Sequence, residues 1–251
     1  MAVNILDRYG IKEVADVTFY ELNDAGERGA PVLYLDTLKV STTEQTAENT
    51  AARGGKGNPE LIMWDYGKEI TVNIEDALFS AKSMAIMFGA NPGDTADFHD
   101  VAKITKTVHV SAITADGMVS TQAGSIKIPT DAKYYDASGK EVAKTEAVYC
   151  TFDLEVEGTE IVISAEKFPG SYYITGDTYA RSENSGKDEF FQFIIPKAKV
   201  LSEVTLTMEA EGDPSTFSMN LKVLRPKDGQ MMKLVKYSLS DGSNAGEDDG
   251  E

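Results

Sequence analysis

The chain has 251 residues, of which 41% are hydrophobic and 26% charged, so it can bury a sizeable core and is not disordered as a whole. Its formal net charge of −17 argues against affinity for the nucleic-acid backbone or for an anionic membrane surface, because both require clustered Lys and Arg. No apolar run is long enough to span a bilayer, and the N-terminus lacks the basic and apolar regions of a secretory signal peptide, so we expect no membrane association.

The first part of the chain predicts two strands followed by a long loop. Residues 13–23 alternate in polarity, and residues 32–44 are rich in residues that favour strands. The next sixteen residues, "QTAENTAARGGKGNPE", contain almost no large apolar side chain. Loops of this length inside a compact domain are usually functional or become ordered against a partner.

A strand and then a helix follow this predicted loop. Ile70, Val72 and Ile74 alternate with polar residues and therefore share one face of a strand. The period becomes helical in "DALFSAKSMAIMFGAN", which predicts a helix of roughly three turns. Asp76 is the predicted N-cap of this helix, and Gly89 is the predicted residue that ends it.

The remainder of the chain is predicted to consist of strands and turns. Several strand-like runs lie between residues 101 and 198, and "DASGKE" and "EGTE" are predicted to be hairpin turns between them. Residues 203–209 and 217–223 alternate in polarity on either side of "EGDPS", which predicts a hairpin with one apolar face. The acidic end of the chain contains few apolar residues and is predicted to be mobile.

These elements predict a mainly β fold, an antiparallel β-sandwich or barrel with one flanking α-helix and an inserted β segment. We expect residues 1–104 and 186–238 to form one β-sandwich domain. Residues 105–185 would form the inserted β domain, and residues 239–251 a flexible acidic tail.

The residue patterns that usually indicate chemistry are absent or incomplete. A phosphate-binding loop requires Ser or Thr after its Gly-Lys pair, whereas Gly57 follows Lys56 here. His99 lies among aspartates, but their spacing matches neither a calcium loop nor a zinc site, which favours a solvated turn. The single Cys150 lies in a strand-like run and is predicted to be a small buried side chain, consistent with folding in a reducing cytoplasm. We therefore predict no catalytic residue, no cofactor and no metal.

Three stretches carry a resemblance to a known family. They are "PVLYLDTLKVSTTEQTAENTAARGGKGNPELIMWDYGKEITVNIED", the helix "ALFSAKSMAIMFG" and the C-terminal "SEVTLTMEAEGDPSTFSMNLKVLRPKDGQMMKLVKY". Together they resemble the major tail tube subunits of tailed bacteriophages over somewhat more than half of the chain. The resemblance implies a structural virion protein, assembled in the host cytoplasm, that polymerises into stacked hexameric rings forming a hollow tube for DNA delivery. It also implies contacts with tape measure, sheath, terminator and baseplate proteins, and passage of DNA without specific binding.

Two sets of residues follow as candidates for this function. The candidates for joining subunits lie in the glycine-rich loop: Arg53, Gly54, Gly55, Lys56 and Gly57. The candidates for the lumen face are the short polar or acidic residues opposite the predicted apolar faces: Glu69, Thr71, Asn73, Glu75, Glu203, Thr205, Thr207 and Glu209.

Two other classes of function stay open. The first is another virion component, such as a baseplate, distal tail, neck or capsid decoration protein. The second is a carbohydrate-binding β domain that would use the aromatic residues of "FPGSYYITGDTYA", although such residues more often form the core and cross-strand pairs of sheets.

Overall fold

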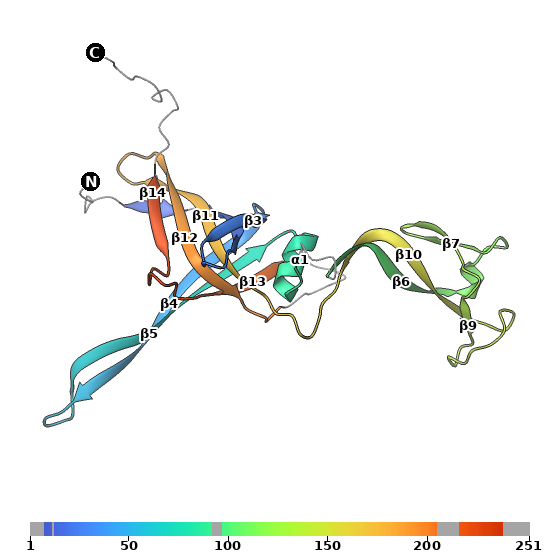
Figure 1. Cartoon of the computed structure of the whole chain (residues 1–251), viewed down its shortest axis with the longest axis horizontal. Helices are drawn as coiled ribbons and strands as arrows, with labels where there is room; N and C mark the ends of the chain where they lie inside the picture. The colour runs from blue at the N-terminus through green and yellow to red at the C-terminus, as the bar shows by residue number, and fades with distance from the viewer. Residues whose placement is uncertain (1–7, 12, 92–96, 205–215, 238–251) are drawn as a thin grey trace, which may run out of the picture. The chain divides into compact units, whose positions relative to one another are not determined.

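The computed structural model describes residues 8–11, 13–91, 97–204 and 216–237. Over these residues the fold is mainly antiparallel β-structure with one α-helix, as the sequence predicts. The chain divides into two compact units, residues 1–92 with 163–251 and residues 93–162 (Figure 1). No helix in the part of the chain that the structure describes is long and apolar enough to cross a bilayer.

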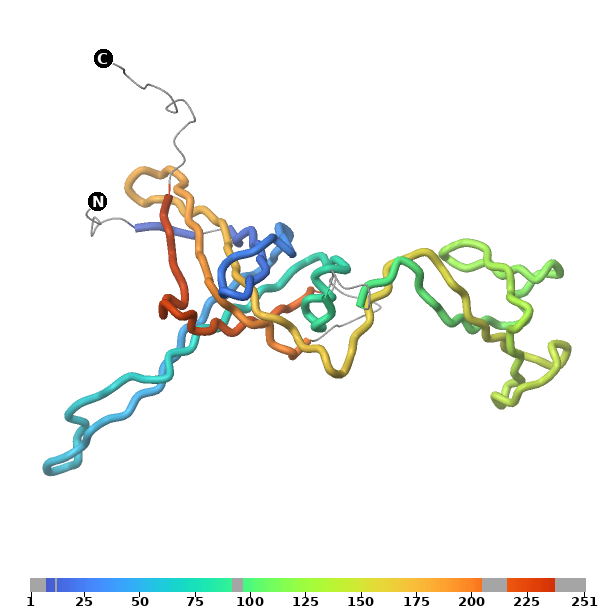
Figure 2. The backbone as a smooth tube through the Cα atoms, viewed as in Figure 1, coloured from blue at the N-terminus to red at the C-terminus, as the bar shows by residue number. Residues whose placement is uncertain are grey.

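The first unit is built on one nine-stranded sheet. Its strands are β1 (Tyr9–Ile11), β2 (Asp16–Leu22), β3 (Arg28–Leu35), β4 (Leu38–Arg53), β5 (Glu60–Asp76), β11 (Ser171–Ser182), β12 (Asp188–Val200), β13 (Phe217–Val223) and β14 (Lys233–Tyr237). The order is β3-β2-β11-β12-β13-β5-β4, with β1 on β11 and β14 on β12. Strands from both ends of the chain therefore lie side by side, as the backbone trace in Figure 2 shows for β2 and β11.

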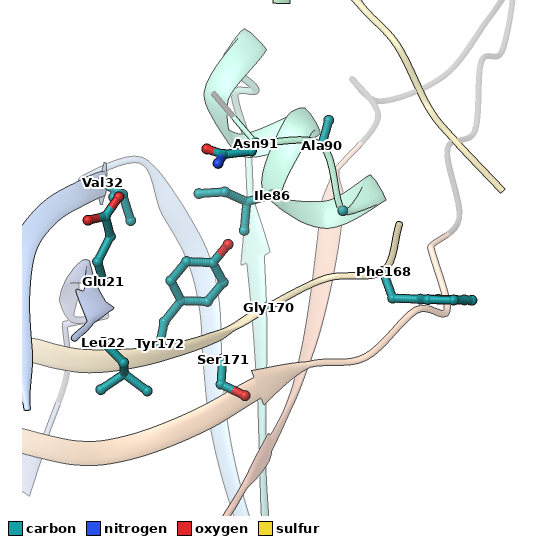
Figure 3. A pocket seen from close by; sticks show the side chains of 11 residues that line it. Glu21, Leu22, Val32, Ile86, Ala90, Asn91, Phe168, Gly170, Ser171 and Tyr172 are labelled. Carbon is teal, nitrogen blue, oxygen red and sulfur yellow. The ribbon is translucent and has the colours of Figure 1, made fainter. Parts of the chain in front are cut away.

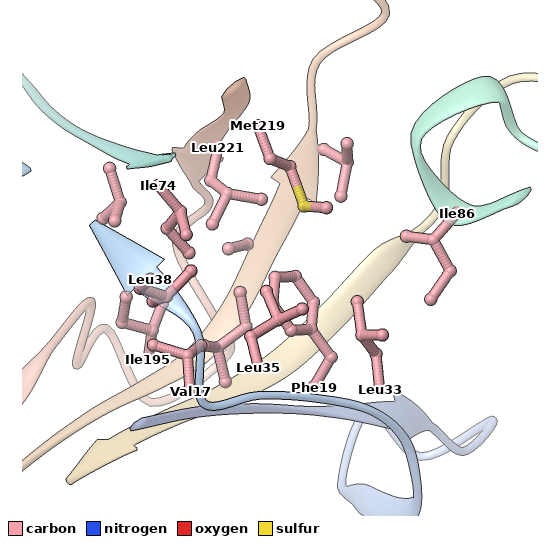
Figure 4. Close-up of a cluster of buried hydrophobic side chains, with 14 of the residues drawn as sticks. Val17, Phe19, Leu33, Leu35, Leu38, Ile74, Ile86, Ile195, Met219 and Leu221 are labelled. Carbon is pink, nitrogen blue, oxygen red and sulfur yellow. The ribbon is translucent and has the colours of Figure 1, made fainter. Parts of the chain in front are cut away.

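A single hydrophobic core holds this unit together. Val17 and Phe19 from β2, Leu35 from β3, and Leu38 from β4 are all buried in it (Figure 4). Because β3 and β4 lie at opposite ends of the strand order yet share one core, the sheet curves around these side chains.

The alternation predicted for Ile70, Val72 and Ile74 is confirmed in β5. Ile70, Val72 and Ile74 are 6%, 2% and 1% exposed, whereas the residues between them are partly exposed. Burial of large aliphatic side chains at this level contributes about 1.5–3 kcal/mol each. The position of the core face of β5 thus follows from the sequence alone.

The helix α1 (Ala81–Phe88) is shorter than predicted and begins later. The prediction of Asp76 as its N-cap is wrong, because Asp76 ends β5 and its carboxylate accepts hydrogen bonds from Thr37 Oγ1 (2.5 Å) and the Leu78 amide (3.2 Å). Ser80 caps the helix instead, in a reciprocal capping box with Ser83.

The predicted end of the helix is correct. Gly89 adopts the left-handed conformation (φ 82°), and its amide donates hydrogen bonds to the Ala85 and Ile86 carbonyls.

Two further predictions about strands need correction. The predicted strand 32–44 is interrupted at Asp36 and Thr37, where the chain passes from β3 to β4. The predicted long loop at residues 45–60 is mostly strand, because β4 and β5 pair along nearly their whole lengths of 16 and 17 residues. Small polar residues can form this part of β4 because the hydrogen bonds that pair it with β5 are made by backbone groups.

The second unit contains β6 (Phe98–His109), a 3₁₀ turn (Val110–Ala112), β7 (Met118–Thr121), β8 (Gly124–Lys127), β9 (Lys133–Tyr135) and β10 (Tyr149–Ile161). β10 pairs with β6 and β9, and β7 pairs with β8. "DASGKE" forms a tight turn between β9 and the bridging Glu141, as predicted. "EGTE" is not a turn, because β10 continues through it with a shift in register between Glu157 and Glu160.

The predicted inserted segment, residues 105–185, overlaps this second unit without coinciding with it. β6 begins seven residues earlier, at Phe98, and β11 belongs to the sheet of the first unit. Local strand patterns do not reveal which sheet a strand joins, so these boundaries could not be read from them.

Candidate assembly surfaces

The outer part of the β4–β5 pair, residues 46–69, is a two-stranded ribbon that we call the outer hairpin. β13 pairs with β5 over residues 71–76, and beyond that point β4 and β5 pair only with each other among the described strands. Figure 1 shows this ribbon extending past the other strands of its sheet. An isolated two-stranded hairpin is marginally stable in water, so a ribbon of this length gains stability when a partner covers it.

The outer hairpin exposes large apolar side chains on one face, which we call the apolar stripe. Ile62, Trp64 and Tyr66 are 55%, 52% and 53% exposed and alternate along β5. Their cross-strand partners on β4 are Ala52, Thr50 and Glu48, which are too small or too polar to cover them. Contiguous exposed apolar residues of this kind are typical of a protein–protein contact.

The opposite face of the same ribbon is also apolar. Leu61 and Met63 are 63% and 55% exposed and point away from the stripe because they occupy the alternate positions of β5. Covering all five side chains therefore requires partner surfaces on both faces of the ribbon.

The glycine-rich residues form the tight end of the outer hairpin. Gly55 and Gly57 have φ values of 83° and 85°, and the Asn58 amide donates to the Gly55 carbonyl (3.1 Å). Arg53 forms an ion pair with Glu60 across the two strands. Lys56 is exposed and has no ion-pair partner among the described residues.

A polar face lies on the other side of the sheet from the core. Its members on β5 are the four predicted lumen residues of that strand: Glu69, Thr71, Asn73 and Glu75. Asn73 Nδ2 donates to Asn220 Oδ1 on β13 (2.7 Å), and Lys222 Nζ forms an ion pair with Glu69 (2.8 Å). These contacts hold the polar side chains in an ordered row across the two strands.

The structure brings one more predicted lumen residue to this row. A groove of about 280 Å³ is lined by Thr71, Asn73 and Glu203 together with Glu44 of β4. Thr205, Thr207 and Glu209 lie outside the described residues, as does much of the hairpin predicted around them.

A pocket lies beside the C-terminal end of α1, and we call it the α1 pocket (Figure 3). It has a volume of about 320 Å³, and its lining includes Val32, Ile86 and the ring of Tyr172 together with the polar Asn91 and Ser171. Glu21 lies beside Val32 at its edge. Burial, and then the Glu21 carboxylate, raises the pKa of the Tyr172 hydroxyl above its ordinary value.

The other groups considered from the sequence have structural roles. Cys150 is fully buried, as predicted, beside Phe152 and Val119 in the small core of the second unit. His99 Nδ1 lies 2.9 Å from Glu160 across the β6–β10 pair. The aromatic run contributes edge-to-face pairs within the sheet, including Phe19 with Tyr172.

Sequence reasoning identified the tip of the outer hairpin but missed its most exposed feature. The run "LIMWDY" predicts strand but gives no distinction between a buried and an exposed face. Their signal was the continuous apolar run itself, because a strand with one solvated face would alternate. The α1 pocket had no comparable signal, since its walls come from four separate segments of the chain.

A β-structured chain whose longest ribbon is apolar on both faces has the surface of a subunit in an assembly. Comparison with known proteins gives the particular class. The chain belongs to the YomU/Tube protein family, whose model matches residues 9–236. It is also similar to the tail tube protein of Bacillus phage SPR, at 21% identity over 255 residues that cover 94% of this chain and 91% of that protein. The resemblance to phage tail tube proteins is thereby confirmed.

Proposed function

We propose that this chain polymerises with its own copies into stacked hexameric rings that form the hollow tail tube of a phage virion. The observation that carries the proposal is the outer hairpin, with five large apolar side chains exposed on two faces. Family membership supports self-association as the way these faces become covered. The protein acts structurally and carries out no reaction of its own.

The outer hairpin joins one copy to the next. It contacts a surface unlike itself, so the association is heterologous and generates rings or open stacks rather than closed dimers. Lys56 at its tip meets an acidic neighbour, which the net charge of −17 makes available on every copy. Arg53 supports the tip from within, through its ion pair with Glu60.

The polar face of β4, β5 and β13 lines the lumen. The exposed side chains of this face are mostly short or acidic. Contacts between β5 and β13, namely Asn73–Asn220 and Glu69–Lys222, hold them in order. Such a wall repels the phosphate backbone and lets DNA pass without binding. Tape measure, sheath, terminator and baseplate proteins are further partners, and assembly takes place in the host cytoplasm.

Electron microscopy of the purified chain at high concentration tests the proposal. We expect hollow tubes with a regular axial repeat. Isolated rings or monomers would instead favour a baseplate, neck or decoration role. A variant in which a two-residue Asn-Gly turn replaces the outer hairpin keeps the core and is expected to form no tubes.

The charge at the tip has its own test. Replacing both Arg53 and Lys56 by Glu should impair tube growth while the circular dichroism spectrum stays unchanged. The single variant Lys56→Glu separates the contact with a neighbour from the internal ion pair of Arg53, and Lys68→Glu, on the same hairpin, is the matched control. Normal tubes from both tip variants would refute the role of these charges.

A further inference from the structure

The α1 pocket is large enough to take one aromatic side chain. Its volume of about 320 Å³ lies at the small end of the range of ligand pockets. Its apolar lining includes Val32, Ile86 and the ring of Tyr172, its polar lining includes Asn91 and Ser171, and the Glu21 carboxylate supplies a hydrogen-bond acceptor at the edge (Figure 3). An aromatic side chain that can also donate a hydrogen bond matches this mixed apolar and polar lining.

The backbone around the pocket is closely fitted. Gly89 ends α1 in the left-handed conformation, and a Cβ there would lie 2.6 Å from the carbonyl carbon of Phe168. Glycine thus lets the segment that leads into β11 pass directly against the helix end. The wall of the pocket is therefore held by backbone contacts.

The chain exposes one side chain with the properties of this occupant. Trp64 is the single tryptophan of the sequence and lies at the centre of the apolar stripe, half exposed. Its cross-strand neighbour Thr50 leaves the indole uncovered. The indole N–H is a donor that must find an acceptor once the ring is buried, and tryptophan is enriched among residues that dominate binding energy.

We propose that Trp64 of one copy inserts into the α1 pocket of another copy, with its indole N–H donated to the Glu21 carboxylate. Figure 1 shows the outer hairpin extending away from α1, so Trp64 does not reach the pocket of its own chain. The contact joins two unlike surfaces, and each copy offers both, so it can repeat without limit. This inference rests on the proposed self-assembly and names the surface that receives the outer hairpin.

Because Trp64 is the single tryptophan, its fluorescence reports on this contact directly. We expect the emission to shift to shorter wavelength and acrylamide quenching to fall when the wild-type chain assembles. Val32→Phe fills the pocket without changing the outer hairpin. It is expected to raise the critical concentration for assembly about tenfold or more and to leave Trp64 exposed at concentrations where the wild type has assembled.

The possible results separate the inference from the proposed function. Tubes in which Trp64 stays as exposed as in the free chain would overturn the inference and leave the tube role intact. The same holds if Val32→Phe assembles normally with a protected Trp64. Absence of any wild-type assembly would overturn the tube role itself.

Disulfide crosslinking gives a second test that does not depend on filling the pocket. Thr50 faces the same side of the hairpin as Trp64, and Asn91 is exposed at the pocket edge, so both can be replaced without removing the Glu21 acceptor. Mixing Thr50→Cys chains with Asn91→Cys chains under assembly conditions should give crosslinked dimers, while Thr50→Cys mixed with Glu27→Cys, outside the pocket, should not. Assembled samples without the Thr50–Asn91 crosslink would overturn the inference.

Discussion

Removing the apolar stripe should weaken assembly without weakening the fold. In the triple variant Ile62→Thr, Trp64→Thr and Tyr66→Thr, threonine keeps the preference for strand structure. Full burial of one such side chain contributes about 1.5–3 kcal/mol, and each is already about half covered within its own chain. Covering the other half in an assembly therefore contributes roughly 2–4 kcal/mol over the three residues.

This loss of free energy predicts a higher critical concentration for assembly. A loss of roughly 2–4 kcal/mol raises the critical concentration for assembly about 30- to 1000-fold, which sedimentation over a range of protein concentrations measures. The melting temperature of the unassembled chain should stay the same, because the stripe lies outside the core. Leu234→Thr, at an exposed apolar residue of β14, is the control for general loss of surface hydrophobicity. A triple variant that assembles at the wild-type concentration would refute the reasoning.

Two further predictions concern stability. Gly89→Ala should lower the free energy of unfolding by about 2–5 kcal/mol, because the alanine is strained in the left-handed conformation and its Cβ clashes with Phe168. The control Gly26→Ala, which lies in open space at φ 80°, should lower it by only about 1–2 kcal/mol. Thermal unfolding of the two variants compares these losses. Equal losses would contradict the close fit at the helix end. Burial raises the pKa of the Cys150 thiol in the folded chain above its value in the unfolded chain. The contribution of this thiol to stability is therefore complete below about pH 8.5. It is lost as the pH rises, because the thiol ionises in the unfolded chain before it ionises in the folded chain. Urea unfolding in reducing buffer should therefore show a steeper alkaline loss of stability for the wild type than for Cys150→Ala, and parallel losses would exclude the thiol as the cause.

The sequence was sufficient for features that depend on neighbouring residues. The alternation of Ile70, Val72 and Ile74 gave the core face of β5, and Gly89 gave the end of α1, because both depend on local geometry. The start of α1 could not be read in the same way. Asp76 and Ser80 are both good capping residues, and the choice between them depends on Thr37, which is distant in sequence.

Features that depend on distant pairing could not be predicted. The residues 45–53 have the composition of a loop, and they form a strand because β5 provides the partner. The insertion of β12 and β13 between β11 and β5 likewise leaves no mark on local patterns. The candidate residues at the hairpin tip were therefore found by composition, whereas the apolar stripe and the α1 pocket required the three-dimensional pairing.

The two-sided character of the outer hairpin has a kinetic consequence. When two copies first meet, one face of a ribbon is covered and Leu61 and Met63 on the other stay in water, so a pair recovers only part of the available free energy. A copy that joins an existing assembly can cover both faces at once. For the proposed assembly we therefore expect nucleated growth, in which a lag precedes polymerisation, short preformed seeds abolish it, and free subunits persist until a starting template is present.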